Sequence, residues 1–406
     1  MSETLLLTEY QEWIGDLLPE DRLFLNREFA KKITHRREMR AEVLRDVVNP
    51  NQYVGVLILP SGLRIELRPK IPTTNVFYML AVAESLPFRE ELADYESLEE
   101  VLEFVVNYFA TLAEERLTAG LYRSYCEAED NLAFVRGRID IAANIRENFA
   151  LRHRTYCRYS ELTWDVPENQ VIRQVAHTLS GWQFRPRTRR RLAQLDTALA
   201  EVSPTRHTSD VVDRFTYSRL NDAYRAVHSL CRLFLVNSSV SESSGAFGFQ
   251  SFLVDMNRLF EQFVTQVLFE ATSGNGIWFA SQRETHLDHA NQVEMKPDFL
   301  LRGAGALIVG DCKYKRLDSG DFKNSDLYQM ISYCTAEGST RGVLVYPRHL
   351  VEADATVEVR RSPIRIEQLT LPLGGTLTDL KLASATLASL LIFGANRDNG
   401  QLAFSA

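Results

Sequence analysis

The feature that most constrains this chain is an apolar run that ends abruptly in charge. Ala306-Leu307-Ile308-Val309 has the composition of a strand buried on both faces, and Asp311-Cys312-Lys313 follows directly after Gly310. Charged side chains are seldom fully buried without a partner. Because side chains alternate across a strand, Asp311 and Lys313 share one face and Cys312 points to the other. The pattern therefore predicts a functional group at the end of a buried strand.

A hairpin precedes this charged end. Its first arm is Asp298 to Arg302, its turn is Gly303-Ala304-Gly305, and its second arm is Ala306 to Tyr314. A turn centred on Ala304 places Asp298 opposite Gly310 and diagonal to Asp311, within reach of a shared ion. The hairpin is thus expected to bring two carboxylates to one point.

Two carboxylates at one point suit a hard divalent cation, which takes one or two of them together with water molecules. We expect Asp298 and Asp311 to bind Mg²⁺, with Mn²⁺ as a substitute, and we treat the Cys312 carbonyl, not its thiol, as a further candidate ligand. A lysine beside them can position the attacking water and neutralise charge on a phosphate, which is the role predicted for Lys313. The predicted chemistry is metal-assisted phosphodiester hydrolysis. A solvated ion pair between Asp311 and Lys313 is the structural alternative.

Three motifs together resemble the PD-(D/E)xK nuclease superfamily. They are Pro297-Asp298, Asp311-Cys312-Lys313 and the Gln329-Met-Ile-Ser-Tyr333 segment, which is similar to the Q-x-x-x-Y helix of the RecB-like branch. Gln329 and Tyr333 are four residues apart, so they share a helix face. The resemblance implies that this helix lies beside the active site and helps to place the DNA or the catalytic residues. A half-buried core helix is the alternative for Tyr333.

A segment upstream extends the resemblance. Residues 255 to 264, Asp-Met-Asn-Arg-Leu-Phe-Glu-Gln-Phe-Val, are similar to the start of the nuclease domain in the McrC family, the cleavage subunits of modified-cytosine restriction systems. Glu261 lies at the border of the apolar helical stripe. The resemblance implies that this helix contributes an acid to the metal site, while an ordinary surface glutamate is the alternative.

The expected fold class is α+β with several domains. We predict an N-terminal mixed β/α docking domain over residues 1–160, a helical middle region over 161–244, and a C-terminal α/β domain of the PD-(D/E)xK restriction-endonuclease type over 245–406. The last boundary is set by the Ser- and Gly-rich segment Ser238 to Gly248. In the first domain, Tyr53 to Leu59 and Leu63 to Leu67 predict a hairpin around Pro60-Ser61-Gly62, a pattern that is also similar to McrC. A short helix is expected from Tyr10 to Leu18, ending near Pro19.

Charge and composition limit the ways in which this chain can meet DNA. The 406 residues carry a formal net charge of −7, which argues against binding nucleic acid through bulk electrostatics. Contact with double-stranded DNA must therefore be local or made through a partner. The first ten residues lack the pattern of a secretory signal, and we find no apolar stretch of the ~20 residues that a membrane span requires. A cytoplasmic protein without a membrane partner is expected.

The resemblance to McrC implies the function and the partner. The chain is expected to be the DNA endonuclease subunit of a GTP-dependent, methylcytosine-directed restriction complex that docks into a hexameric McrB-like AAA+ GTPase and stimulates it. No G-x-x-x-x-G-K-[ST] loop occurs in this sequence, so GTP is expected to act only through the partner. Two alternatives remain. One is an inactive nuclease-like scaffold that activates the AAA+ partner, and the other is a free-standing RecB-type repair nuclease that cuts DNA alone.

Overall fold

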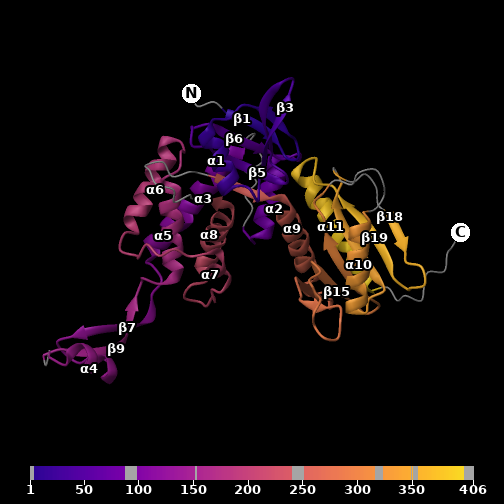
Figure 1. Ribbon diagram of the computed structural model, residues 1–406. Helices are drawn as coiled ribbons and strands as arrows, with labels where there is room; N and C mark the ends of the chain where they lie inside the picture. Colours follow the sequence, from indigo (N-terminus) through magenta and orange to yellow (C-terminus); the bar gives the residue numbers. More distant parts are fainter. Residues whose placement is uncertain are drawn as a thin grey trace. The chain divides into compact units, whose positions relative to one another are not determined.

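The computed structural model describes residues 4–86, 98–150, 153–239, 251–315, 323–348, 350 and 355–396. The chain is an α+β protein with two compact units, of which the first comprises Met1–Val101 and Ser241–Ala406 and the second Leu102–Val240 (Figure 1). This division differs from the predicted one, because the first unit joins the N-terminal part of the docking domain to the C-terminal domain. Most of the predicted linker at 238–248 and the end of the chain after Asn396 lie outside the described residues.

The first sheet of unit 1 contains the predicted N-terminal hairpin. Its strands β1 (Thr4–Thr8), β6 (Arg64–Arg68), β5 (Tyr53–Ile58) and β11 (Ser251–Asp255) lie side by side in this order. Strands β5 and β6 are antiparallel, which confirms the hairpin, and β11 pairs antiparallel with β5 although about 200 residues separate them. Gly55 has φ +143°, and a Cβ there would lie 1.9 Å from the Phe252 carbonyl oxygen. Glycine therefore allows β11 to approach β5.

A smaller sheet and a helix follow β1. Strands β2 (Trp13–Gly15), β4 (Val43–Asn49) and β3 (Thr34–Arg40) form the sheet, and α1 spans Pro19–Glu28. The prediction of a helix from Tyr10 to Leu18 was wrong, because Pro19 begins a helix instead of ending one. Proline suits the first helical position, where its missing N–H would have no intrahelical partner.

The second sheet of unit 1 carries the catalytic candidates. Its order is β12 (Trp278–Ser281), β15 (Phe299–Arg302), β16 (Leu307–Cys312), β17 (Arg341–Pro347), β19 (Arg365–Leu371) and β18 (Ala355–Glu358). Strands β16, β17 and β19 are parallel to one another, whereas β12, β15 and β18 join antiparallel. Ile308 and Val309 are buried, as the apolar run predicted, whereas Ala306 and Leu307 are half-buried. The two-stranded pair β13 (Thr285–His286) and β14 (Glu294–Met295) lies in the connection between β12 and β15.

Three helices contact this sheet, and a fourth, α2 (Thr73–Ala83), packs on two of them. The three that contact it are α9 (Met256–Thr272), α10 (Asn324–Glu337) and α11 (Leu377–Asn396). Helix α10 packs on β16 and β17, α9 packs on β12 and β16, and α11 packs on α9 and β15. Helix α11 has the length and apolar composition of a membrane span, contrary to the expectation that no such stretch exists. Its Leu380, Leu387 and Leu391 are buried in unit 1.

Unit 2 combines a helical body with an arm. The helices are α3 (Leu98–Ala119), α5 (Pro167–Ser180), α6 (Pro186–Ala198), α7 (Ser209–Asp213) and α8 (Arg225–Asn237), with a 3₁₀ turn at Asp222–Tyr224 and the short β10 (Ser238–Ser239) after α8. Between α3 and α5, strands β7 (Ser124–Leu132), β8 (Arg138–Ile139) and β9 (Thr155–Thr163) and helix α4 (Ile141–Asn148) extend away from α5 and α8 (Figure 1). We call residues 124–163 the arm.

Candidate active site

The hairpin formed by β15 and β16 brings Asp298 and Asp311 together, but in a different register from the predicted one. Phe299 pairs with Gly310 and Arg302 with Leu307, so Asp298 and Asp311 are the next residues beyond the last pair. The prediction that Asp298 lies opposite Gly310 was wrong by one residue. The turn includes Ala306, whose carbonyl accepts the Gly303 N–H at 3.2 Å, and its centre therefore falls after Ala304. Facing residues project to the same side of a sheet, so the correction places the two carboxylates closer together.

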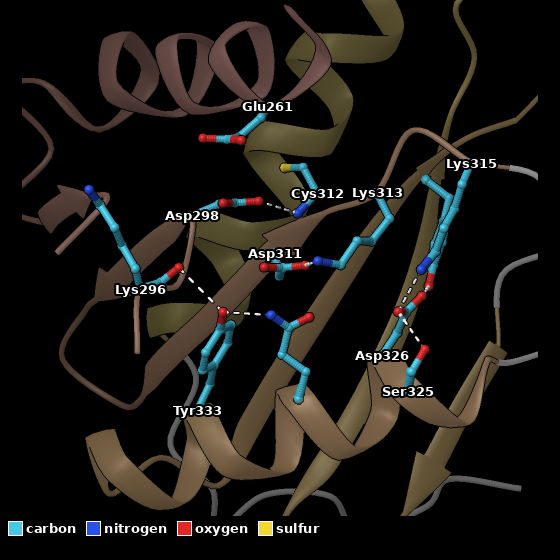
Figure 2. Close-up of polar contacts among 12 residues, drawn as sticks. Glu261, Lys296, Asp298, Asp311, Cys312, Lys313, Lys315, Ser325, Asp326 and Tyr333 are labelled. Carbon is cyan, nitrogen blue, oxygen red and sulfur yellow. Dashed lines mark hydrogen bonds and ion pairs between the residues drawn. The ribbon is translucent and has the colours of Figure 1, made fainter. Parts of the chain in front are cut away.

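Both carboxylates are buried and held by specific partners. Asp298 is 7% exposed and Asp311 is 3% exposed. The Oδ2 of Asp298 accepts the Cys312 backbone N–H at 2.7 Å, and its Oδ1 accepts the Gln282 side-chain amide at 3.0 Å. The Nζ of Lys313 lies 2.5 Å from the Oδ2 of Asp311 (Figure 2). Asp311 and Lys313 therefore form a largely buried pair at the strand end, unlike the solvated pair of the structural alternative.

Glu261 approaches the two aspartates from α9. Asp255 caps this helix by accepting the Asn257 N–H at 2.9 Å, which sets where the helix begins. Glu261 then points toward Asp298 (Figure 2), and the amide nitrogen of Gln282 donates to its Oε1 at 2.5 Å. Gln282 thus bridges Glu261 and Asp298. No sequence pattern indicates Gln282, because it belongs to no motif and acts from a left-handed position with φ +51° after β12.

Burial and mutual repulsion dominate the electrostatics of the acids. Burial raises the pKa of Asp298 to about 8, and the charges of Asp311 and Glu261 add to the effect. Burial also raises the pKa of Asp311, against the influence of Lys313. The pKa of Glu261 is raised by burial and by the charge of Asp311. Ionising three close carboxyl groups is costly without more positive charge, so the cluster has the electrostatic character of a cation site.

Lys313 supplies part of that charge. Burial acts to lower its pKa, but attraction to Asp311 and Asp298 outweighs this and the pKa is raised. The lysine therefore carries a full positive charge at neutral pH. A charged lysine fixed beside two aspartates can stabilise negative charge on a substrate oxygen.

Gln329 and Tyr333 lie on α10 at the border of the site. The Gln329 amide donates to the Tyr333 hydroxyl at 2.7 Å, and that hydroxyl donates to the Lys296 carbonyl at 3.4 Å (Figure 2). Tyr333 is 7% exposed. Lys296 precedes Pro297-Asp298, so the pair contacts the backbone that leads into the first carboxylate. Their predicted role in placing DNA remains a prediction.

A second ion pair lies next to Lys313. The Nζ of Lys315 is 2.6 Å from the Oδ1 of Asp326, and the Tyr346 hydroxyl donates to Oδ2 at 2.6 Å. Burial acts to raise the pKa of Asp326, but the hydrogen bonds from Lys315 and Tyr346 outweigh it and the pKa is lowered. The pairing of Lys315 with Asp326 was not predicted from the sequence. The alternation of Lys313 with Lys315 was the available signal.

The donor set fits Mg²⁺ or Mn²⁺. Among the described residues, no three His, Cys, Asp or Glu side chains are arranged as ready ligands for one ion. A hexacoordinate ion that keeps several waters needs only one or two carboxylates, which Asp298 and Asp311 could supply. The Cys312 thiol is buried, and burial raises its pKa well above the usual range, so the thiol is a poor ligand. The Cys312 carbonyl remains a candidate.

Comparisons with known proteins agree with this architecture. A family model described as "McrBC 5-methylcytosine restriction system component" matches residues 48–347. A solved Thermococcus gammatolerans structure, described as a refined half-complex from a tetradecameric assembly of McrB AAA+ hexamers with bound McrC, matches with a TM-score of 0.57 and 20% identity, over 95% of this chain and 100% of that one. The cryo-EM structure of the Thermococcus gammatolerans McrBC complex matches with a TM-score of 0.44 and 21% identity, over 69% and 89%. No curated protein matches the chain. The first of the two structures shares the fold.

Proposed function

The chain belongs to the family of McrBC 5-methylcytosine restriction system components, and we propose that within such a system it is the subunit that hydrolyses DNA phosphodiesters with Mg²⁺. The observation that carries this proposal is the convergence of Asp298, Asp311 and Lys313 at the end of a buried strand. Burying paired carboxylates whose pKa values are raised costs folding free energy, and such groups cluster at functional sites. In this reading the C-terminal domain has the PD-(D/E)xK nuclease fold.

Each residue then has a defined task. Asp298 and Asp311 hold Mg²⁺ or Mn²⁺, and the bound ion supplies polarisation of the phosphate and activation of a water. Lys313 places its positive charge where the phosphate gains negative charge. Glu261 and Gln282 keep Asp298 in its orientation, and Gln329 and Tyr333 hold the backbone at Lys296. The Cys312 N–H bond to Asp298 ties the two strand ends together.

The proposed partner is a hexameric McrB-like AAA+ GTPase. The structure with the similar fold is described as containing McrB AAA+ hexamers with bound McrC. The arm, most of which lies within the predicted docking domain 1–160, supports such a contact because it exposes large apolar side chains that the rest of unit 2 does not cover. They include Tyr125, Phe134, Ile141, Ile145 and Phe149. Ile141, Ile145 and Phe149 recur every four residues along α4 and its C-terminal cap, so they share one face, and an exposed apolar face of this kind marks a protein interaction site.

In this proposal the partner binds GTP and brings the DNA to this chain. This chain carries no phosphate-binding loop, so GTP enters only through the partner. With a net charge of −7, the chain is suited to receive double-stranded DNA from a protein that already grips it. The methylcytosine-directed complex is expected to work in the cytoplasm.

Two other functions fit less well. An inactive scaffold that only activates the AAA+ partner has no reason to keep Asp298 and Asp311 buried beside a charged Lys313. A free-standing RecB-type repair nuclease would have to bind DNA by itself, which the acidic character of the chain does not favour.

The test is DNA cleavage by the assembled complex. The full chain is co-purified with an McrB-like AAA+ GTPase and given methylated plasmid, GTP and Mg²⁺. Asp298→Asn and Asp311→Asn keep the shape of each side chain and remove its charge, so cleavage should fall at least a hundredfold while GTP hydrolysis and complex formation persist. Glu358→Gln, which removes an exposed acid at the sheet edge, is the matched control and should cut normally. Undiminished cutting by both aspartate variants would eliminate the proposed site.

A further inference from the structure

The two residues that directly follow the N-terminal strand β1 contact Tyr314, the residue after Lys313. Glu9, directly after β1, is fully buried. Its Oε1 accepts the Tyr314 hydroxyl at 3.0 Å and the Lys70 backbone N–H at 2.8 Å. The hydroxyl of the next residue, Tyr10, donates to the Tyr314 carbonyl at 3.0 Å. Two consecutive residues therefore hold both the ring and the backbone of Tyr314 across more than 300 positions of sequence.

Glu9 and Tyr10 are themselves fixed to the first sheet. The Glu9 N–H donates to the Arg68 carbonyl at 3.0 Å, and the Tyr10 N–H donates to the Asn51 carbonyl at 2.8 Å. The Lys70 ammonium lies 5.2 Å from the centre of the Tyr10 ring. Tyr314 is thus tied to β6 and to the loop before β5 through short, directed contacts. Movement of that sheet would be passed to Tyr314.

Tyr314 lies just beyond the point where the hydrogen bonds between β16 and β17 end. The parallel ladder between β16 and β17 ends at Cys312 with Val345, and one further bond joins the Lys313 N–H to the Val345 carbonyl at 2.9 Å. In an extended segment, neighbouring side chains point to opposite sides, so Tyr314 and Lys313 project away from each other. Fixing the ring and carbonyl of Tyr314 therefore fixes the direction in which Lys313 leaves the backbone.

Glu9 is an unusual residue to place at this point. Burial raises the pKa of its carboxyl group, and its Oε2 has no hydrogen-bond partner among the described residues. An apolar side chain would avoid this cost of burial. The hydrogen bond that the carboxyl group accepts from Tyr314 gives a reason for a buried acid at this position.

We propose that Glu9 and Tyr10 are positioning residues for the cleavage reaction, which hold Lys313 in place through Tyr314 and couple the N-terminal sheet to the active site. The inference rests on the proposed function for the role of Lys313. It assigns to the first sheet a task beyond partner docking. A displacement of that sheet when the partner binds would change the position of Lys313 relative to Asp311.

The experiment compares variants of the full chain, each co-purified with the same McrB-like AAA+ GTPase. Glu9→Leu removes both bonds that Oε1 makes. Glu9→Gln keeps one oxygen at the Oε1 position, which can still accept from Lys70 and Tyr314. With saturating methylated plasmid, GTP and Mg²⁺, the cleavage rate should fall at least tenfold for Glu9→Leu and stay within twofold for Glu9→Gln. The concentration of DNA that gives half the maximal rate should stay within twofold for both.

Hydrogen exchange provides a readout that does not depend on cleavage. In Glu9→Leu, the amides of Cys312 and Lys313 should exchange at least tenfold faster, while the amides of β17 keep their wild-type rates. Glu66→Leu is the matched control, because Glu66 is a largely buried acid of the same sheet whose partner is Arg68 at 3.0 Å. It should leave both cleavage and the exchange of Cys312 and Lys313 unchanged.

The outcomes separate this inference from the proposed function. If Asp298→Asn and Asp311→Asn abolish cutting while Glu9→Leu cuts and exchanges like the wild type, the positioning role is wrong and the nuclease stands. If the aspartate variants cut normally, the nuclease assignment is wrong, and faster exchange in Glu9→Leu alone still supports the coupling.

Should Glu9→Leu fail to fold, the variant Tyr314→Phe tests the inference instead. That variant keeps the ring, which lies 5.9 Å from that of Phe260, and removes only the hydroxyl. A wild-type rate and wild-type exchange in Tyr314→Phe would overturn the inference.

Discussion

Asp298 accepts the backbone N–H of Cys312 at 2.7 Å, so the first carboxylate is tied to the main chain between Asp311 and Lys313. This bond crosses the open end of the hairpin, beyond the last ladder pair of Phe299 with Gly310. It satisfies an amide that would otherwise be buried without a partner. The same contact leaves the second oxygen of Asp298 to Gln282, and the geometry of the site therefore depends on a residue outside every motif.

Replacing Gln282 by alanine should separate Glu261 from Asp298. Loss of the bridging amide removes the hydrogen-bond donor between two acids whose pKa values are raised. We therefore expect DNA cleavage to be ten- to hundredfold slower and Mn²⁺ binding, measured by calorimetry, to be weaker. Gln266→Ala, on the exposed side of α9 and bonded to Glu270 at 2.9 Å, is the control. Equal Mn²⁺ affinity and cleavage in the two variants would show that the bridge has no function.

Gly310→Ala should destabilise unit 1 through a single contact. A Cβ at residue 310 would lie 1.9 Å from the Phe299 ring, and overpacking of this kind costs about 1–3 kcal/mol. Chemical denaturation measures the loss. The double variant with Phe299→Leu should recover part of it, because the smaller side chain leaves room. A double variant whose destabilisation is the plain sum of the two single changes would contradict the proposed contact.

His228 should make the stability of the chain depend on pH. Burial lowers the pKa of this histidine to about 4, below the ~6.5 expected in the unfolded chain. Its ring nitrogens lie 3.0 Å from the Tyr217 hydroxyl and 2.9 Å from the Glu168 carbonyl oxygen, and the Tyr224 ring packs beside it. Between these two pKa values the unfolded state binds more protons, so the contribution of His228 to stability is fully present above pH 6.5 and is lost as the pH drops toward 4.

Thermal melting at pH 7.5 and at pH 5 checks this dependence. His228→Gln should be less stable at pH 7.5 but should lose less stability on acidification than the wild type. His177→Gln is the control, since His177 is exposed and pairs with Asp196 at 3.0 Å. If His228→Gln loses as much stability as the wild type between the two pH values, His228 is not the titrating group.

Charged substitutions on the arm should remove partner binding without unfolding the chain. Phe149 is 88% exposed and Ile145 is 64% exposed, so Phe149→Asp and Ile145→Asp cost little folding free energy. Introducing charge into an apolar interface core is strongly unfavourable. We expect at least tenfold weaker association with the co-expressed AAA+ protein in size-exclusion chromatography. Leu220→Asp, at an 81% exposed position of unit 2 outside the arm, should bind normally. Similar losses at all three positions would argue against the arm as the docking surface.

The sequence was informative wherever a local pattern determined the structure. The apolar run before Asp311 predicted a buried strand, and the glycines after Arg302 predicted a hairpin, because both signals lie within a few residues of the element they specify. The register was wrong by one residue because glycine marks a turn without fixing how many residues it contains. Pro19 was misread for a similar reason, since proline fits both just after a helix and at its first position.

What could not be predicted depends on contacts between distant parts of the chain. Gln282 acts from a loop with no pattern, and Glu9 meets Tyr314 only after the two sheets have assembled. The pairing of β11 with β5 is of the same kind. A strand of five residues gives no indication of which sheet it will join, because any buried edge offers the same hydrogen-bonding groups.

The pairing of β11 with β5 limits where the chain can be truncated. A fragment that starts at residue 245 would contain β11 without the neighbour that normally covers its edge, and α9 would begin from an unpaired strand. Exposed strand edges recruit other molecules and promote aggregation. The part of the chain from residue 245 onward is therefore not expected to fold as an independent fragment. It should be expressed together with the first hundred residues, as one polypeptide or as two chains that reassemble.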